Sequence, residues 1–323
     1  STQVIVEAAN SLIAKNSAQI KKECFSQVEG GDKIEIVKAY TDSEEAFLVA
    51  SSILSKYSSS KLPYSGFAVL YRTNAQSRAI EEALRKRAIP YRIYGGHSFY
   101  DRAEVKDIIA YMRLLVNPRD DEALRRVVNV PSRGIGATSI SRVSQAAMEH
   151  GISLWEAITH YLEGNKDAPD LAQFGLKGAA IERLALFCKM IAEVRSKVGT
   201  VDAYDVAKEI FAVSGYSQML TSDNSIEGLT KRENVDELFA SIKSFVEEGE
   251  AELQMELEEK RELEKRGERG EKIELEGEFK TSVLLNDFLE TISLMSAVDD
   301  NAGEESGDRV NLMTVHSAKG LEF

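Results

Sequence analysis

Cysteine and tryptophan are scarce in this sequence, and no long apolar run occurs in it. The chain has 323 residues, of which two are cysteines and one is a tryptophan. Cys24 and Cys188 lie far apart with no partnering histidine pattern, so we expect neither a disulfide framework nor a zinc site. No run approaches the roughly 18 apolar residues that a membrane helix needs. The first residues also lack the basic and apolar regions of a signal peptide. We therefore expect a soluble, cytoplasmic protein with no membrane partner and no bound metal.

The dipeptide Gly-Lys is absent, and with it the P-loop that holds nucleotide phosphates. No Asp-Glu pair follows an apolar strand, because Asp121-Glu122 and Asp236-Glu237 both lie in helical patterns. The chain does not begin with methionine, and it stops at Phe323 where an apolar segment is about to begin. We expect an excised piece of a longer protein that alone holds no cofactor tightly.

Negative charge is in excess, but it is unevenly distributed. The net charge is -13, yet residues 247–278 contain fourteen glutamates against six basic residues, whereas residues 66–145 contain fourteen basic residues against eight acidic ones. Because charges act over about 8 Å at physiological salt, the basic part can meet phosphates although the whole chain is acidic. Residues 247–278 are equally compatible with an exposed charged helix and with partial disorder, and no chemistry is assigned to them.

The first third of the chain alternates between strand and helix patterns. Residues 33–40 alternate as a strand does, and Thr41 or Asp42 is positioned to cap the helix that follows. A continuous apolar run at 66–71 is typical of a buried parallel strand, and a helix at 75–88 and a strand at 91–94 come next. This alternation predicts an α/β layer with a parallel sheet.

Helical periodicity dominates from about residue 119 to residue 297, and strand character returns at 309–315. The simplest account is an α/β domain interrupted by a mostly α-helical insertion. We therefore predict a first part of the α/β domain at 1–118, the helical insertion at 119–307, and the resumed α/β domain at 308–323.

Two blocks carry polar residues after apolar runs, and the loop of the C-terminal block lies at the end of a predicted strand, where ligands bind in open α/β sheets. The C-terminal block, 310–323, ends in a loop that contains Thr314, His316, Ser317, Lys319 and Glu322. The block at 67–78 places Arg72, Thr73 and Asn74 after an apolar run. The two blocks resemble motifs V and IV of the superfamily 1 DNA helicases of the UvrD, PcrA and Rep type, and residues 95–107 resemble the stretch that follows motif IV.

The resemblance implies the C-terminal half of such a helicase, truncated at motif V. The fold would be an incomplete RecA-like lobe, called 2A, interrupted by a helical subdomain called 2B. The parent would be an ATP-dependent three-prime to five-prime DNA helicase that uses ATP and Mg²⁺. Its partners would be single-stranded and duplex DNA and a missing first RecA-like lobe. Motif VI would follow the chain, and the arginine that reaches the γ-phosphate would precede Ser1.

The resemblance also implies individual roles. His316 would couple the nucleotide state to DNA, and Glu322 would contact the ribose of ATP. The single strand would be held through its phosphates by Arg72, Thr73, Asn74, Ser317 and Lys319. For Arg72 and Arg78 the competing interpretation is an ion pair with Glu81 or Glu82.

A glycine-containing turn at 129–140 precedes a predicted helix. Backbone N–H groups at a helix start can hold a phosphate, and here Thr138, Ser139 and Arg133 add donors beside Gly134 and Gly136. Taken alone, such a turn most often only caps a helix, and Ser139 breaks the dinucleotide-binding pattern. Similar sequences in the helicase family form a helix-hairpin-helix-like element that touches duplex DNA, so we expect a duplex contact here.

A second function remains open at this point, namely a non-catalytic DNA-binding module of a repair or recombination protein. The resemblance of the 310–323 block, with its ribose-contacting glutamate, favours the helicase. The oligomeric state and the particular DNA transaction are not determined by the sequence.

Overall fold

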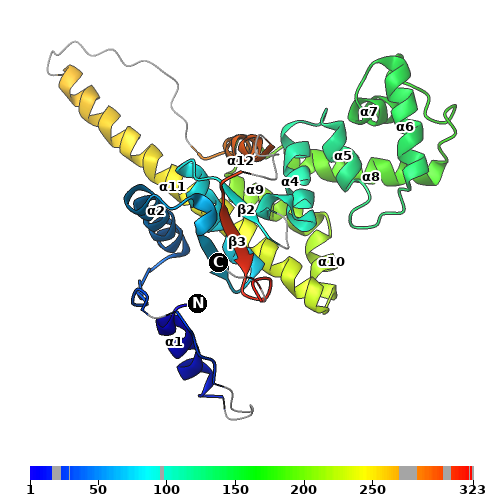
Figure 1. The fold of residues 1–323 in the computed structure, drawn as a ribbon. Helices are drawn as coiled ribbons and strands as arrows, with labels where there is room; N and C mark the ends of the chain where they lie inside the picture. Colours follow the sequence, from blue (N-terminus) through cyan, green and yellow to red (C-terminus); the bar gives the residue numbers. More distant parts are fainter. Residues whose placement is uncertain are drawn as a thin grey trace.

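The computed structural model describes residues 1–16, 23–28, 30–94, 98–268, 282–300, 307–319 and 321 (Figure 1). The strands are β1 (Ala68–Tyr71), β2 (Tyr91–Ile93) and β3 (Val310–Thr314). The helices are α1 (Gln3–Ile13), α2 (Asp42–Ser60), α3 (Ser77–Lys86), α4 (Ala103–Val116), α5 (Asp121–Val127), α6 (Ala137–His150), α7 (Leu154–Glu163), α8 (Gly178–Arg195), α9 (Ala203–Val213), α10 (Tyr216–Ser222), α11 (Ile226–Glu268) and α12 (Leu285–Asp300). Short 3-10 helices lie at Tyr64–Gly66, Asn74–Gln76 and Phe99–Asp101. The protein is therefore rich in helices and carries a small sheet.

The described strands form one parallel sheet in the order β1-β3-β2. The last strand in the sequence is the central one, and its register pairs Tyr71 with Thr314 and Ile93 with Leu312. Central strands of a parallel sheet are buried on both faces, and Val310, Leu312 and Met313 are fully buried. The predicted strands at 66–71, 91–94 and 309–315 are confirmed, and the predicted parallel pairing is confirmed with them.

Helices α2 and α3 pack on this sheet through a small apolar cluster. Ala50 of α2 and Leu84 of α3 are fully buried in that cluster together with Val310 and Leu312 of β3. Helix α2 begins as the sequence predicts, because the side chain of Thr41 accepts a hydrogen bond from the N–H of Glu44. The sheet and these two helices form the frame on which the loops after β1 and β3 are carried.

The strand predicted at residues 33–40 is wrong. These residues have no regular secondary structure, and no strand pairs with them in the described part of the chain. Ile36 is 85% exposed and Tyr40 is 95% exposed, so the apolar side chains of the alternating pattern are not packed against a core. An alternating segment becomes a strand only when a neighbour completes its hydrogen-bond ladder, which the pattern itself cannot supply.

The second and larger core joins helices α4 to α12. Its buried side chains run from Phe99 to Ile292, so α4 packs with the helices that follow residue 119. This core therefore reaches further toward the N-terminus than the boundary predicted at residue 118, and the division into domains stays a prediction. Cys188 is buried in this core, and burial raises the pKa of its thiol to about 12.

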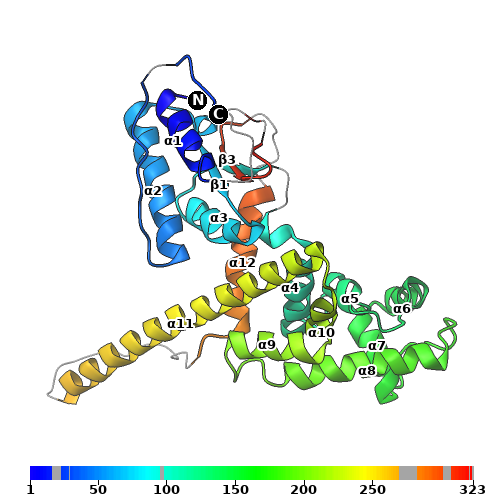
Figure 2. The same cartoon turned by 90° about the horizontal axis from the view of Figure 1, so that it is seen from below.

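Helix α11 continues far beyond its packed part. Val235, Leu238, Ile242 and Val246 are buried, but the helix runs on to Glu268, and its C-terminal end extends away from the other elements (Figure 2). Of the two interpretations of residues 247–278, the helix holds for the backbone as far as Glu268, and residues 269–278 lie outside the described residues. No helix among the described residues has the length and apolar character needed to span a membrane.

Candidate nucleic-acid interface

The two polar loops predicted from the sequence meet at the carboxyl ends of β1 and β3. Arg72 follows β1 directly, and His316 lies two residues beyond the end of β3. The Nη1 atom of Arg72 lies 3.1 Å from the Nδ1 atom of His316, although 244 residues separate them in the sequence. The N–H of Val315 donates to the carbonyl of Tyr71, which extends the strand pairing to the start of both loops. The parallel register thus brings the two blocks together.

The loop after β1 is shaped by a residue that the sequence analysis did not single out. The Oε1 atom of Gln76 accepts hydrogen bonds from the N–H groups of Arg72, at 2.9 Å, and Thr73, at 3.0 Å. Thr73 and Gln76 form a capping box around the short 3-10 helix that begins at Asn74. The only sequence signal for this role is the spacing of a threonine and a glutamine three residues apart.

The loop after β3 is held by its own side chains. The hydroxyl groups of Thr314 and Ser317 lie 2.9 Å apart, and the N–H of Ser317 donates to Thr314 Oγ1. Lys319 is exposed at the end of this turn, and Asn74 is exposed on the neighbouring loop. Glu322, predicted to contact a ribose, lies outside the described residues.

This arrangement presents hydrogen-bond donors to solvent on two adjacent loops. Arg72, His316 and Lys319 are exposed, and none of them pairs with a carboxylate in the described part of the chain. Nitrogen donors that are not neutralised by acidic partners suit the phosphates of a nucleic acid. Within the described residues, no group of three or more histidine, cysteine, aspartate or glutamate side chains could hold a metal ion.

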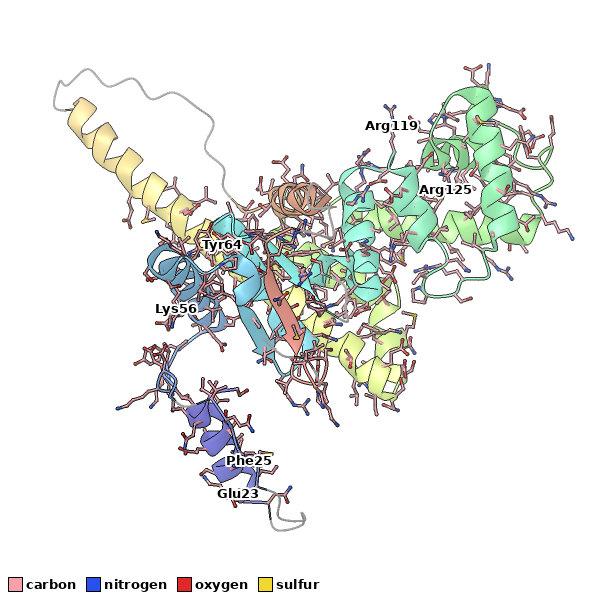
Figure 3. The ribbon with its side chains drawn as sticks, in the orientation of Figure 1. Glu23, Phe25, Lys56, Tyr64, Arg119 and Arg125 are labelled. Atoms are coloured by element: carbon pink, nitrogen blue, oxygen red, sulfur yellow. The ribbon has the colours of Figure 1, made fainter. Side chains whose placement is uncertain are left out.

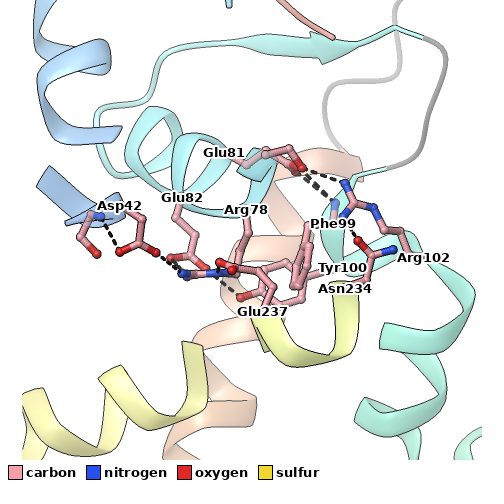
Figure 4. A network of polar contacts seen from close by, with 11 residues as sticks. Asp42, Arg78, Glu81, Glu82, Phe99, Tyr100, Arg102, Asn234 and Glu237 are labelled. Atoms are coloured by element: carbon pink, nitrogen blue, oxygen red, sulfur yellow. Dashed lines mark hydrogen bonds and ion pairs between the residues drawn. The ribbon is translucent and has the colours of Figure 1, made fainter. Parts of the chain in front are cut away.

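Arg78, in contrast, is a structural residue. Its side chain is buried and donates to Glu82 at 3.0 Å, to Glu237 at 2.5 Å and to Asp42 at 3.3 Å (Figure 4). Burial by itself lowers the pKa of Arg78, but Glu82 and Glu237 outweigh it and raise the pKa. The ion-pair interpretation is confirmed for Arg78 and is wrong for Arg72, which contacts His316 instead.

A second part of this polar network surrounds Glu81. Its carboxylate, 1% exposed, accepts hydrogen bonds from the Ser98 hydroxyl and the Phe99 N–H, and burial raises its pKa. Arg102 donates to Ser77 of α3 and to Asn234 of α11, both at 2.8 Å. The helix that follows the Arg72 loop is thus joined to the helical core by buried polar contacts (Figure 4).

In the turn at residues 129–140, the side chain of Arg133 forms hydrogen bonds within the protein. The guanidinium of Arg133 donates to the carbonyls of Val127, Pro131 and Ser214 and to the Tyr111 hydroxyl, at 2.7 to 3.2 Å. Its donors are therefore engaged within the protein, and the contact of Arg133 with duplex DNA stays a prediction that these hydrogen bonds disfavour. A local pattern could not show this, because the carbonyl of Ser214 is 81 residues away.

The exposed residues of this turn keep the geometry that was predicted. Gly134 has a φ of 69°, which favours glycine, and Gly136 is the residue before the first turn of α6. Thr138 is exposed and Ser139 partly exposed in that first turn, where backbone N–H groups lack helical partners. Arg183 of α8 donates to the carbonyl of Gly134 at 2.9 Å and is exposed, so a cation that the sequence analysis missed lies beside the turn.

Comparison with known proteins agrees with these observations. Residues 1–323 match the family model described as UvrD-like helicase C-terminal domain. Proteins named ATP-dependent DNA helicase PcrA are 36% identical over 324 residues in Leuconostoc citreum, 36% identical over 327 residues in Bacillus subtilis and 33% identical over 323 residues in Staphylococcus aureus strain Mu50. Each alignment covers 100% of this chain but only 38% or 39% of the relative. Because the family model matches every residue, this protein belongs to the family of UvrD-like helicase C-terminal domains.

Proposed function

We propose that this chain is the second RecA-like lobe, 2A, of an ATP-dependent three-prime to five-prime DNA helicase, with the helical subdomain 2B inserted in it. The sheet with α2 and α3 corresponds to the lobe, and the core of α4 to α12 corresponds to the insertion. The names of the relatives support a helicase over a non-catalytic DNA-binding module. The chain spans about two fifths of the length of those relatives, so the remaining motor parts belong to other segments of the parent.

The observation that carries the proposal is the meeting of Arg72 and His316 at the carboxyl ends of neighbouring parallel strands. In this proposal the single strand lies across the two loops. Its phosphates are held by Arg72, Thr73 and Asn74 from one loop and by Ser317 and Lys319 from the other. Phosphate contacts carry no base information, so binding is sequence-tolerant and weakens with salt.

A separate duplex contact lies at the first turn of α6. Both views place α6 away from the sheet, at the far end of the helical part (Figures 1 and 2). There the backbone N–H groups beside Gly136, with the hydroxyls of Thr138 and Ser139, provide donors to a phosphate. Gly134 supplies the backbone conformation of the turn, and Arg183 adds positive charge. The single strand and the duplex are therefore bound by different parts of the chain.

Nucleotide chemistry requires residues that this chain does not contain. ATP and Mg²⁺ need a P-loop, and no Gly-Lys dipeptide occurs in the sequence. Of the residues predicted for this site, only Glu322 belongs to the chain, as a contact to the ribose. The coupling role of His316 therefore depends on the first lobe of the parent.

The proposal is tested by measuring ATP hydrolysis by the purified chain with and without single-stranded DNA. We expect binding of the single strand without ATP turnover above background. A preparation with DNA-stimulated ATPase activity that co-purifies with the chain through successive columns would contradict the assignment to a second lobe.

A further inference from the structure

The contact between Arg72 and His316 determines where the histidine carries its proton. A guanidinium has five N–H donors and no acceptor, so the Nδ1 atom 3.1 Å away has to accept. An imidazole whose Nδ1 accepts is neutral and carries its proton on Nε2. An imidazolium at the same place would bring two donors and two positive charges together.

We propose that Arg72 is a positioning residue that fixes His316 as the neutral tautomer with its proton on Nε2. The inference rests on the proposed function, because it specifies what His316 presents to DNA. With Nδ1 engaged by Arg72, the remaining polar group of the ring is the Nε2–H donor. The guanidinium keeps further N–H groups beside it, so a phosphate meets two kinds of donor from two loops.

The usual arrangement of a functional histidine is the reverse. Nδ1–H commonly donates to a carboxylate or a backbone carbonyl, which leaves Nε2 as an acceptor. In the described part of the chain, neither Arg72 nor His316 pairs with a carboxylate. A cation in the place of the carboxylate inverts the tautomer, and a ring with its donor outward suits an anionic ligand. The next charged residue after His316 in the sequence is Lys319, which adds a second cation and has no hydrogen-bond acceptor in its side chain.

The backbone that carries each of the two side chains is held by hydrogen bonds on both loops. The side-chain oxygen of Gln76 accepts a hydrogen bond from the N–H of Arg72. The carbonyl of Tyr71 accepts one from the N–H of Val315, the residue just before His316. On the other loop, the N–H of Lys319 donates to the carbonyl of His316 at 3.3 Å and closes the turn. Because both loops leave strands that are paired in register, Arg72 and His316 start from neighbouring positions at the edge of the sheet.

The tautomer is measured directly by long-range proton–nitrogen NMR of the full chain labelled with ¹⁵N-histidine, at a pH where the ring is neutral. The chain has four histidines, and the variant His316→Gln assigns the signal of His316 by its loss. We expect a fixed pattern in which Nδ1 resonates as an unprotonated nitrogen and Nε2 as a protonated one. In Arg72→Met, a change at an exposed side chain, we expect both shifts to move toward the values of a ring that exchanges between its tautomers.

Arg125→Met is the matched control, since Arg125 is an exposed arginine of the helical part, away from the sheet (Figure 3). It should leave the signals of His316 unchanged. The proposal is overturned if His316 shows exchange-averaged shifts in the unsubstituted chain, or if its shifts are the same in Arg72→Met. These spectra are recorded without DNA, so they test the tautomer alone. If the tautomer is fixed but neither Arg72→Met nor His316→Gln weakens single-strand binding, the proposed function fails and this inference stands.

Discussion

Arg78 Nε lies 2.5 Å from Glu237 Oε1, and this ion pair joins α3, which follows the Arg72 loop, to α11 of the helical core. The two residues are 159 positions apart in the sequence. Glu82 and Asp42 share the same guanidinium, so one arginine connects three helices. The loop that carries Arg72 is therefore supported by the helical core, which also carries the turn at residues 129–140.

Substitution of Arg78 should lower the free energy of unfolding more than substitution of Glu237 does. Arg78→Met leaves several carboxylates without their cation and should cost about 3–5 kcal/mol. Glu237→Gln leaves Arg78 with Glu82 and Asp42 and should cost about 1–2 kcal/mol. Urea denaturation followed by circular dichroism measures both values. Glu233→Gln, one turn earlier on α11 and exposed, is the control and should change stability by less than about 0.5 kcal/mol. Equal effects at positions 233 and 237 would contradict the role of this pair.

Arg133 is predicted to stabilise the fold rather than to contact DNA. Arg133→Met removes the donors of several carbonyl groups, so the free energy of unfolding should fall by about 3 kcal/mol. Chemical denaturation of this variant and of Arg125→Met, which removes an exposed arginine, provides the comparison. If Arg133→Met left the stability unchanged and weakened duplex binding, the result would contradict this prediction and favour a direct contact of Arg133 with DNA.

The first turn of α6 is predicted to bind duplex DNA. Thr138→Glu places a negative charge where the helix dipole favours it, so the helix is retained while phosphate is repelled. We expect the affinity for a duplex oligonucleotide to fall at least several-fold in fluorescence anisotropy. Gln145→Glu, an exposed change of the same charge further along α6, should leave the affinity unchanged. Equal affinities of the two variants would remove this turn from the interface.

Glu156 provides a test of pH dependence in the helical part. Hydrogen bonds from the backbone and side chain of Ser153, followed by Arg119, lower the pKa of Glu156 from 4.5 to about 2. Because the pKa is depressed in the folded state, the stabilising contribution is complete above pH 4.5 and is lost as the pH falls toward 2. Ser153→Ala keeps the backbone N–H that is the largest cause, so carboxyl NMR titration should show this pKa rising in Ser153→Ala and in Arg119→Met but staying below 4.5 in both. A pKa that does not move in Ser153→Ala, or that reaches 4.5 there, would contradict this account.

The sheet, the helical region and the family were predictable because each leaves a local pattern. The apolar run before His316 indicates a buried strand, and a buried strand in the middle of a parallel sheet needs no alternation. The run before Arg72 does form a strand, but β1 is not buried as expected, since Leu70 is 48% exposed. The helicase family that residues 67–78 and 310–323 indicated is confirmed by the family match. The strand predicted at residues 33–40 was wrong because an alternating pattern gives a segment one apolar side but does not provide the neighbouring strand that it must pair with.

The contacts between distant segments could not be predicted. Nothing near Arg133 in the sequence shows that Ser214 accepts its hydrogen bond, and nothing near Gly134 indicates Arg183. The pairing of Arg72 with His316 follows from the register of β1 and β3, which only the folded sheet fixes. Candidate site residues could therefore be named from the motifs, whereas their hydrogen-bond partners required the structure.

The central claim is that the loops after β1 and β3 bind the phosphates of single-stranded DNA. The most direct test is the salt dependence of single-strand binding, measured by fluorescence anisotropy for the unsubstituted chain and for the double variant Arg72→Met/Lys319→Met. Loss of two phosphate contacts should weaken binding equally for different base sequences. It should also reduce the slope of log K against log salt by about 1.4. The control double variant Arg125→Met/Lys189→Met should keep the original slope. An unchanged affinity and slope in Arg72→Met/Lys319→Met would contradict the claim.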